Sequence, residues 1–416
     1  MPDAALAPRY FTRFSCLGGA CEDTCCSSWS ISVDADHHKK LRRALGQTKA
    51  DREMFEKSVK RVRSGRTDAK FALIVLNPTT GYCNFLGADK LCSLHRRFGE
   101  PILPDVCSTY PRRQSLVGDR MEMTAALSCP EAARQALLPK DAMELVDVDP
   151  KVAVRDLFVQ IAEGADVYET SLDVVRMSIL QIIAGAPSLA AGLGTVAALA
   201  DVLGESFGQG KPFDPALLAK TLDDFQNPAR AEQVAAALAT IDVPLEVPMR
   251  PLLQILAKRV DLPEGQFGNV LKHAVEAFAI SENAVVVDVA KAYLARRELV
   301  AGVVDQRLNE ILTNYALNHT FAQWFTSSSN LGVWVRGLIL RVALIRFLAY
   351  AHPEIAALTS TATEGDAVRT VERVTIDTVY RLARTVDHHQ PFVKLLDQVL
   401  PQTMPGLEHA LCMLKM

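Results

Sequence analysis

Cysteine is almost missing from most of this 416-residue sequence: beyond residue 129 there is only Cys412. The other eight cysteines lie close together near the N-terminus: Cys16, Cys21, Cys25, Cys26, Cys83, Cys92, Cys107 and Cys129. Reduced cysteine is an acceptable core residue, but cysteines used in that way would be spread along the chain. The crowding therefore indicates metal binding or redox chemistry in the N-terminal part.

The sequence also lacks a strong net charge and a secretory signal. The formal charge is −3, so no overall basic field predicts nucleic-acid binding. The first residues, MPDAALAPRYFTRFSC, contain no basic segment followed by an apolar run. We therefore expect a cytoplasmic protein, whose thiols stay reduced and do not form disulfides.

One long apolar stretch resembles a membrane span but carries three arginines. It reads LGVWVRGLILRVALIRFLAY, from Leu331 to Tyr350, and contains Arg336, Arg341 and Arg346. Each charge at the centre of a bilayer costs at least about 2.5–3.5 kcal/mol, so no membrane insertion is expected. At 100° per residue the three arginines point in different directions, so at least one faces protein and needs a partner there.

The composition and the hydrophobic pattern of the sequence change near residue 146. Residues 1–145 are rich in Gly, Pro and Cys, with a charged helix expected at about Ala35–Ser64. From there on, Ala, Leu and Val recur at helical spacing between Pro and Gly. The sequence thus predicts a mainly α fold: an irregular, cysteine-rich cluster-binding domain over 1–145 and an all-helical domain over 146–416. Expected helices include Val152–Glu163, Leu189–Leu203, Val285–Leu299, Val304–Phe325, Leu331–Ala351, Gly365–Asp387 and Pro391–Leu400.

The cysteine spacing is C-x4-C-x3-C-C, then 56 residues, then C-x8-C-x14-C-x21-C. Four thiolates complete a tetrahedral zinc site or bind an iron–sulfur cluster. Eight candidates can therefore supply one cluster with spare thiols, or two sites. Neighbouring residues rarely ligate one ion together, so Cys25 and Cys26 are expected to face different ways.

Several segments together resemble the flagellin lysine-N-methylase family (FliB-type) and a related group of zinc- or iron-chelating proteins. They are RYFTRFSCLGGACEDTCCSSWSISVD from Arg9, CNFLGADKLCSLHRRFGEPILPDVCSTYPRR from Cys83, and ALSCPEAAR from Ala126. Two later segments, NEILTNYALNHTF from Asn309 and RTVDHHQPF from Arg384, are also similar to the family. The similarity is dense over about residues 9–135 and sparse afterwards.

The resemblance implies methyl transfer from S-adenosylmethionine (SAM) to lysine ε-amines of flagellin or of another lysine-bearing protein. It also implies a cysteine-bound [4Fe–4S] cluster, with zinc as the alternative. The ligands carried over are Cys21, Cys25, Cys26, Cys83, Cys92, Cys107 and Cys129. Nothing in the sequence fixes the oligomeric state.

A few other residues are candidates for the chemistry. We predict catalytic roles for Tyr110, Tyr315 and His388, and cofactor binding by Arg112, Asn314 and Asn318. Asn314 and Asn318 share a helix face and can bind the methyl donor or form a polar seam between helices. His388 follows Asp387, which suits proton transfer, although a helix C-terminus also favours histidine.

No nucleotide-binding methyltransferase fold is evident. The nearest glycine motif, AAGLGTVAALADVL from Ala190, has no preceding strand and sits in a helical pattern. A metal-chelating or redox-sensing binding protein without methyltransferase activity is therefore the alternative function. It predicts metal binding without SAM binding.

Overall fold

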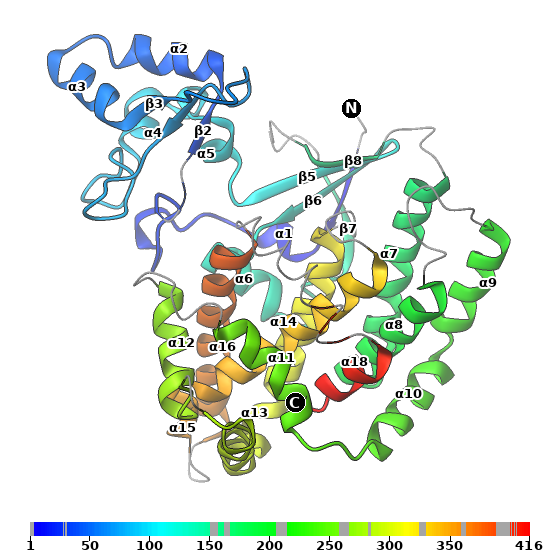
Figure 1. Ribbon diagram of the computed structural model, residues 1–416. Coiled ribbons are helices and arrows are strands. Elements are labelled where there is room, and N and C mark those ends of the chain that lie inside the picture. The colour runs from blue at the N-terminus through cyan, green and yellow to red at the C-terminus, as the bar shows by residue number, and fades with distance from the viewer. Residues whose placement is uncertain are drawn as a thin grey trace. The chain divides into compact units, whose positions relative to one another are not determined.

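The computed structural model describes residues 4–27, 29, 31–149, 157–161, 167–204, 214–257, 266–281, 284–323, 330–358, 363–387, 400, 402, 404 and 406–416. The chain forms two units. The first contains Met1–Ala132 and Leu145–Gln160, and the second contains Ala133–Glu144 and Ile161–Met416. The chain thus passes into the second unit, returns to the first and passes back again (Figure 1).

A five-stranded sheet with strand order β7-β1-β6-β5-β8 forms part of the first unit. Its strands are β1 (Ala5–Pro8), β5 (Arg112–Val117), β6 (Arg120–Ala125), β7 (Leu145–Val148) and β8 (Leu157–Ile161). β5 and β6 form an antiparallel hairpin whose turn contains Gly118 at φ +60°, a conformation that glycine adopts without strain. β1 pairs in parallel with β6 and antiparallel with β7.

A three-stranded antiparallel sheet, β2-β4-β3, carries most of the cysteine-bearing loops. Its strands are β2 (Ile31–Val33), β3 (Val59–Arg61) and β4 (Ala72–Ile74), and the helices of the unit are α1 (Tyr10–Arg13), α2 (Ala35–Ala44), α3 (Lys49–Ser58), α4 (Ser93–Phe98) and α5 (Asp105–Thr109). Two 3-10 turns, η1 (Gly18–Ala20) and η2 (Glu100–Ile102), complete it. An apolar core that includes Val33, Leu41 and Phe85 lies beneath the sheet, and Cys83 and Cys92 pack against it.

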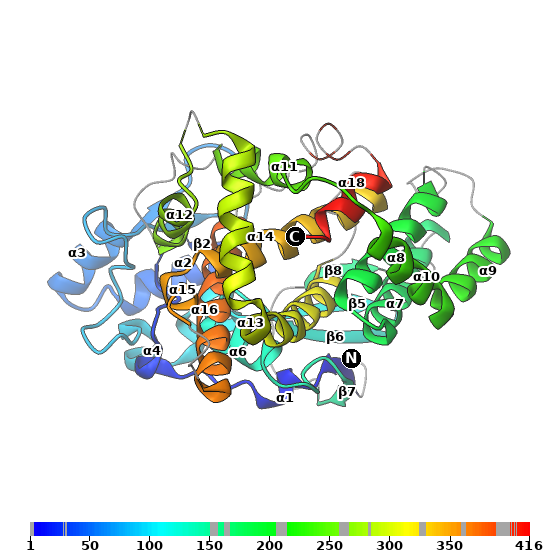
Figure 2. The same ribbon diagram turned by 90° about the horizontal axis from the view of Figure 1, so that it is seen from below.

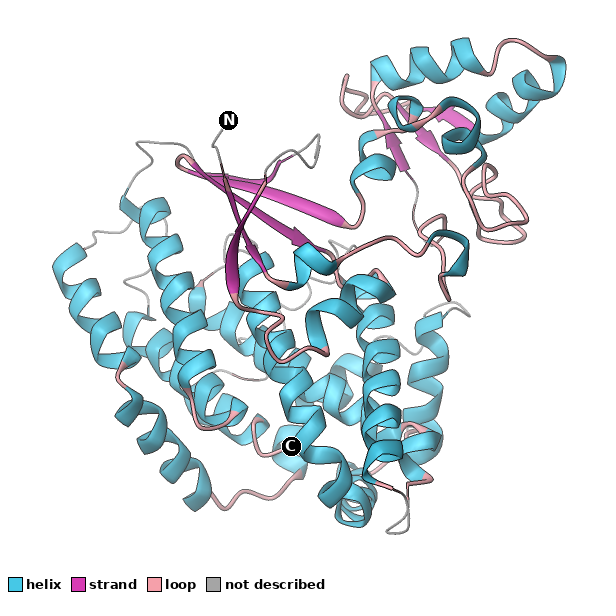
Figure 3. Ribbon diagram, turned by 180° about the vertical axis from the view of Figure 1, so that it is seen from behind, coloured by secondary structure: helices cyan, strands magenta, loops and turns pink. Residues whose placement is uncertain are grey.

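The second unit is helical in its described residues (Figures 2 and 3). Its helices are α7 (Val167–Gly185), α8 (Leu189–Leu203), α9 (Pro215–Gln226), α10 (Pro228–Thr240), α11 (Glu246–Ala257), α12 (Gln266–Ala277), α13 (Val286–Ala322), α14 (Leu331–Ala351), α15 (Pro353–Ala356), α16 (Glu364–Val386) and α18 (Leu407–Met413). α6 (Pro130–Leu137) leads into this unit. The 37-residue α13 packs against α7, α14 and α16, so it is the central element.

Helix α14 contains the three arginines of the apolar stretch, and two of them have polar partners. Arg341 is 8% exposed and donates to Asp387 Oδ1 at 2.8 Å, which confirms that at least one of them faces protein with a carboxylate partner. Arg346 donates to Asn309 Oδ1 at 2.6 Å. None of the described helices combines the length and the apolar character needed to cross a membrane.

The predicted mainly α class, with a cysteine-rich N-terminal part and a helical remainder, is confirmed, but three segments differ from expectation. Val152–Glu163 was expected to be helical, yet Leu157–Ile161 forms edge strand β8, because its β-branched and aromatic residues suit a sheet. The helix expected at Ala35–Ser64 divides into α2 and α3, because the side chain of Thr48 caps a new helix, and its last part contains strand β3 (Val59–Arg61). The two helices expected between Val285 and Phe325 form one helix over their described part, because a lone glycine there costs only about 1 kcal/mol.

The glycine motif from Ala190 lies within helix α8, whose N-terminus is capped by Ser188. A Cβ on Gly194 would meet Val234 Cγ1 at 2.7 Å, so this glycine allows close packing of α8 and α10. The motif therefore serves helix packing, as expected for a glycine motif that lies in a helical pattern with no preceding strand. The expected helix Pro391–Leu400 lies, apart from its last residue, outside the described residues.

Candidate metal centre and polar sites

Four cysteine thiols influence one another in the first unit: Cys25, Cys83, Cys92 and Cys107. They come from four separate segments. Cys25 lies in the loop before β2, and Cys83 and Cys92 lie in short β-bridges with Leu76 and Leu86. Cys107 lies within α5.

The electrostatics of these thiols reflect burial and mutual proximity. Burial, with smaller contributions from the thiols of Cys92 and Cys25, raises the pKa of Cys83 to about 11, while a hydrogen bond with the backbone of Phe85 opposes this shift. Burial of the Cys107 thiol also raises its pKa, although the residue as a whole is exposed, and Cys92, Cys83 and Cys25 add to the effect. Without a metal the thiols of Cys83 and Cys107 are therefore protonated at neutral pH, and metal binding has to release their protons.

A second group consists of Cys16, Cys21 and Cys129. Burial raises the pKa of Cys129 to about 11, opposed by the backbone N–H groups of Ala132 and Glu131 at the start of α6, while Cys21 and Cys16 raise it. Burial also raises the pKa of Cys21. Seven of the nine cysteines thus fall into a set of four and a set of three by their electrostatic influence, a division that the spacing did not reveal, whereas Cys26 and Cys412 belong to neither set.

Cys26 takes part through its backbone. Its carbonyl accepts a hydrogen bond of 2.7 Å from the N–H of Cys83 and so ties the first loop to the segment that carries the next thiol. This contact does not involve the Cys26 thiol, so metal binding by that thiol stays a prediction. Cys412, in contrast, is buried in α18 of the helical unit.

A further cluster near the first thiol set was missed by sequence reasoning. The ligand atoms of Asp34, His37 and Asp105 all lie within 4.8 Å of one another, whereas no three described thiols are that close together. Nδ1 of His37 is 2.5 Å from Oδ2 of Asp34. Burial opposes ionisation of Asp34, but hydrogen bonds from the His37 backbone and ring hold its pKa below the usual range.

The sequence indicates the pairing of two of these three residues, Asp34 and His37. Asp34 is the N-cap of α2, where it accepts from the N–H groups of Asp36 and His37, and an Asp three residues before a His on a helix places the two together. Asp105 is distant in sequence and was not predictable. An Asp–His pair with a second carboxylate can hold a proton or a divalent cation.

Tyr110 and Arg112 lie in the first unit. The Tyr110 ring centroid is 5.2 Å from that of Trp29, and its hydroxyl shares a hydrogen bond of 3.1 Å with Ser128, the residue before Cys129. The guanidinium of Arg112 lies 5.3 Å from the centre of the Phe14 ring. Tyr110 therefore lies beside the segment that carries Cys129, and its catalytic role stays a prediction.

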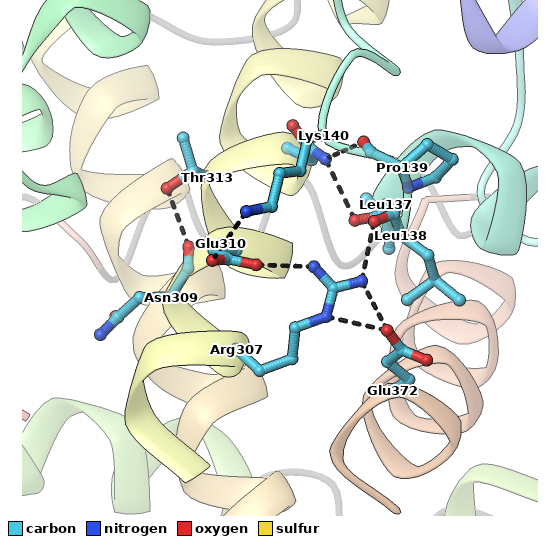
Figure 4. Close-up of polar contacts among 10 residues, drawn as sticks. Leu137, Leu138, Pro139, Lys140, Arg307, Asn309, Glu310, Thr313 and Glu372 are labelled. Carbon is cyan, nitrogen blue, oxygen red and sulfur yellow. Dashed lines mark hydrogen bonds and ion pairs between the residues drawn. The ribbon is translucent and has the colours of Figure 1, made fainter. Parts of the chain in front are cut away.

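Asn314 holds a turn of the helical unit. It is 8% exposed, and its Nδ2 donates to the carbonyl oxygens of Leu137 at 3.1 Å and Pro139 at 3.0 Å. The turn formed by residues 137–140 faces α13 (Figure 4). Both amide hydrogens are thus already bonded to protein, which favours the structural alternative for this residue.

Tyr315 and Asn318 are buried in the core of the helical unit, at 3% and 2% exposure. Burial raises the pKa of Tyr315 to about 12, and Arg341 donates a hydrogen bond to its hydroxyl. Arg341 in turn pairs with Asp387, so the structure joins two of the segments that the sequence singled out. His388 lies outside the described residues.

Comparison with known families covers most of this architecture. The FliB lysine N-methylase C-terminal domain matches residues 179–413, which is more than half of the chain. The chain belongs to the FliB lysine N-methylase family. A domain described as zinc- or iron-chelating matches residues 15–130, the segment that contains all eight N-terminal cysteines.

Two Salmonella relatives match the FliB-family chain over 138 residues at 30% identity. One is the lysine-N-methylase of Salmonella typhimurium, and the match covers 33% of this chain and 33% of that protein. The other is the flagellar biosynthetic protein FliU of Salmonella muenchen, of which 79% is covered. No solved structure matches this chain.

Proposed function

We propose that the protein transfers methyl groups from SAM to lysine ε-amines of a protein substrate, with flagellin as the first candidate. The observation that carries the proposal is the presence on one chain of the FliB lysine N-methylase C-terminal domain and of a chelating domain. The names of the Salmonella relatives, a lysine-N-methylase and a flagellar biosynthetic protein, support the same substrate class.

The reaction sets simple requirements. The amine nitrogen bonds to the methyl carbon of the sulfonium while the carbon–sulfur bond breaks, SAM leaves as a neutral thioether, and the nitrogen loses a proton. The site has to hold the donor in line with a neutral amine and to accept that proton. No electron is transferred, so the chemistry itself needs no redox centre.

We assign Cys25, Cys83, Cys92 and Cys107 as the ligands of an iron–sulfur cluster, [4Fe–4S]. Four thiols are the donor set that zinc and iron–sulfur clusters prefer. A tetrahedral zinc with Zn–S bonds of about 2.3 Å brings its sulfurs within about 3.8 Å of one another. No three of the described thiols lie within 4.8 Å of one another, so they would have to move closer together to hold a zinc ion. When bound, the cluster supplies a cross-link between four separate chain segments.

The structure leaves distinct tasks for the other predicted residues. Burial raises the pKa of Tyr315 to about 12, so it keeps its proton at neutral pH and can donate or accept a hydrogen bond, and its catalytic role stays a prediction. Donor binding by Asn314 would have to use its carbonyl oxygen, because its N–H groups are bonded to the turn. Roles for Tyr110, His388, Asn318 and Arg112 stay predictions.

Methyl transfer is tested with purified, metal-loaded protein, SAM and flagellin. We expect a gain of one or more methyl groups on intact flagellin by mass spectrometry, located on lysines by peptide analysis. Flagellin whose amines have been acetylated is the control and should gain none. Absence of any mass gain on flagellin and on a mixture of lysine-rich proteins would refute the proposal.

The cluster assignment is tested by spectra and metal content of Cys107→Ser and Cys83→Ser, with Cys412→Ser as the matched control. We expect both ligand variants to lose iron and the visible absorption of the cluster, while Cys412→Ser keeps both. Cys129→Ser should retain the cluster if the two thiol groups are separate. A colourless native protein with bound zinc would contradict the iron–sulfur assignment.

A chelating or redox-sensing protein without methyltransferase activity is the second candidate function. The observation that favours it is that the thiol groups are well defined, whereas no described loop provides a recognisable nucleotide site. Calorimetry with SAM separates the two candidates. Saturable SAM binding by the metal-loaded protein excludes the second candidate, and absence of binding excludes the first.

A further inference from the structure

A cavity of about 620 Å³ opens between α13, α16 and the turn at residues 137–140, all within the helical unit. Its apolar wall includes Leu138, Val303 and Val368. Its charged lining consists of Lys140, Arg307, Glu310, Glu364 and Glu372. This volume is within the usual range for ligand sites, and the carboxylates outnumber the basic groups by three to two.

The guanidinium of Arg307 is fully engaged in hydrogen bonds with other groups of the protein. Its Nε and one terminal nitrogen donate to Glu372 Oε1 at 2.9 and 2.6 Å, the other terminal nitrogen donates to Glu310 Oε2 at 2.7 Å, and the carbonyl of Leu138 accepts a further bond of 2.7 Å (Figure 4). The side chain is 14% exposed. A guanidinium held on three sides in this way positions the two glutamates and has little left to offer an anionic ligand.

Lys140 is held loosely in the same place. Its ammonium is 3.9 Å from Glu310 Oε1, too far for a hydrogen bond, and its side chain is 84% exposed. The turn that carries it is fixed to α13 by the hydrogen bonds from Arg307 and Asn314. A lysine of the chain itself therefore lies next to a carboxylate oxygen that Arg307 does not use.

We propose that this groove binds a lysine side chain of the protein substrate, with Glu310 and Glu372 facing its ammonium and Lys140 displaced. The inference rests on the proposed function, because it identifies the substrate group as a lysine. An exposed ammonium at 3.9 Å gains little and can be replaced at low cost. The apolar wall suits the methylene stem of an incoming lysine.

Binding is measured without SAM, so that it does not depend on methyl transfer. The probes are a fluorescent pentapeptide with one central lysine between alanines and the same peptide with norleucine at the centre. We expect the lysine peptide to bind more tightly by fluorescence anisotropy. Glu310→Gln should weaken its binding about five- to tenfold, the equivalent of a partly buried charge pair. Glu298→Gln, an exposed carboxylate on the same helix, should not change it.

The response of Lys140 distinguishes this proposal from an anion site. Lys140→Ala removes the internal competitor, so the lysine peptide should bind about two- to fivefold more tightly. Weaker binding in Lys140→Ala would overturn the proposal, since it would mean that the groove uses Lys140 to attract an anion. Glu310→Gln that weakens SAM binding and leaves peptide binding unchanged would also overturn it.

Gly302 provides a variant that leaves every ion pair in place. It lines the groove from helix α13, and a Cβ built on it meets nothing within 4 Å. Gly302→Leu should fill the groove and reduce peptide binding, whereas Gly302→Ala should leave binding intact. If methyl transfer occurs on flagellin but neither Gly302→Leu nor Glu310→Gln changes peptide binding or KM, the groove proposal fails while the proposed function stands.

Discussion

The pair formed by Arg341 and Asp387 allows a quantitative test of the helical core. The two side chains are 10% and 14% exposed, and their N–O distance is 2.8 Å. Arg341 also donates to the Tyr315 hydroxyl, so Asp387→Asn removes the countercharge and leaves one neutral partner. Removal of one member of a buried pair costs about 3–5 kcal/mol. Because asparagine still accepts one hydrogen bond, we expect a loss of about 3 kcal/mol.

The assay is thermal and urea unfolding followed by far-UV circular dichroism, which reports mainly on the helical unit. For a unit of this size, about 3 kcal/mol corresponds to a fall in Tm of about 6–10 °C. The double variant Arg341→Met with Asp387→Leu should recover most of the loss, because no unpaired charge remains buried. Glu276→Gln, which removes the exposed partner of Lys272 on α12, is the control and should leave Tm unchanged. If Asp387→Asn changes Tm no more than this control does, the reasoning is refuted.

Three further results are expected. Gly194→Ala should destabilise the helical unit by about 1–3 kcal/mol in urea unfolding, because the new methyl would overlap Val234. A variant more stable than the native protein would disprove this packing. Burial and the neighbouring His273 lower the pKa of His352 to about 4, so the folded state binds fewer protons than the unfolded state below pH 6.5. The free energy of unfolding should therefore fall as the pH drops from 6.5 to 4. His352→Asn, which keeps an acceptor for the N–H of Glu354, should remove about 1–2 kcal/mol of that fall after solvent screening, and identical pH profiles would refute this cause. Removal of the metal with a chelator under reducing conditions should increase proteolysis of the cysteine-rich unit and leave the melting of the helical unit unchanged. An equal loss of stability in both units would contradict two separate folding units.

Helices with strong end signals could be predicted from the sequence. The expected Leu331–Ala351 agrees with α14 in both bounds, because Asn330 caps its start and Pro353 lies just beyond its end. Strand β8 could not be predicted, because its short apolar run suits a helix or a strand, and only pairing with a distant strand decides between them.

The sequence predicted the chemistry of the candidate metal centre, but it did not predict which thiols lie together. The spacing of the cysteines indicated a metal, but which thiols meet depends on the folding of a 56-residue segment between Cys26 and Cys83. The acidic groove was also missed. Glu310 and Glu372 lie on different helices, and the signal that joins them, the branched contacts of Arg307, exists only in three dimensions.

The position of the Leu137–Lys140 turn has a consequence for how the protein is made. Arg307 is 169 residues after Leu138, the residue whose carbonyl it binds, and Asn314 is 177 residues after Leu137. At about 5–20 residues per second, the ribosome delivers these partners roughly 10–30 s after the turn itself. The first unit has by then received β7 and β8, so its sheet can form early. The turn between α6 and β7 is held only once α13 has followed, and the groove is complete only once Glu372 on α16 has followed as well.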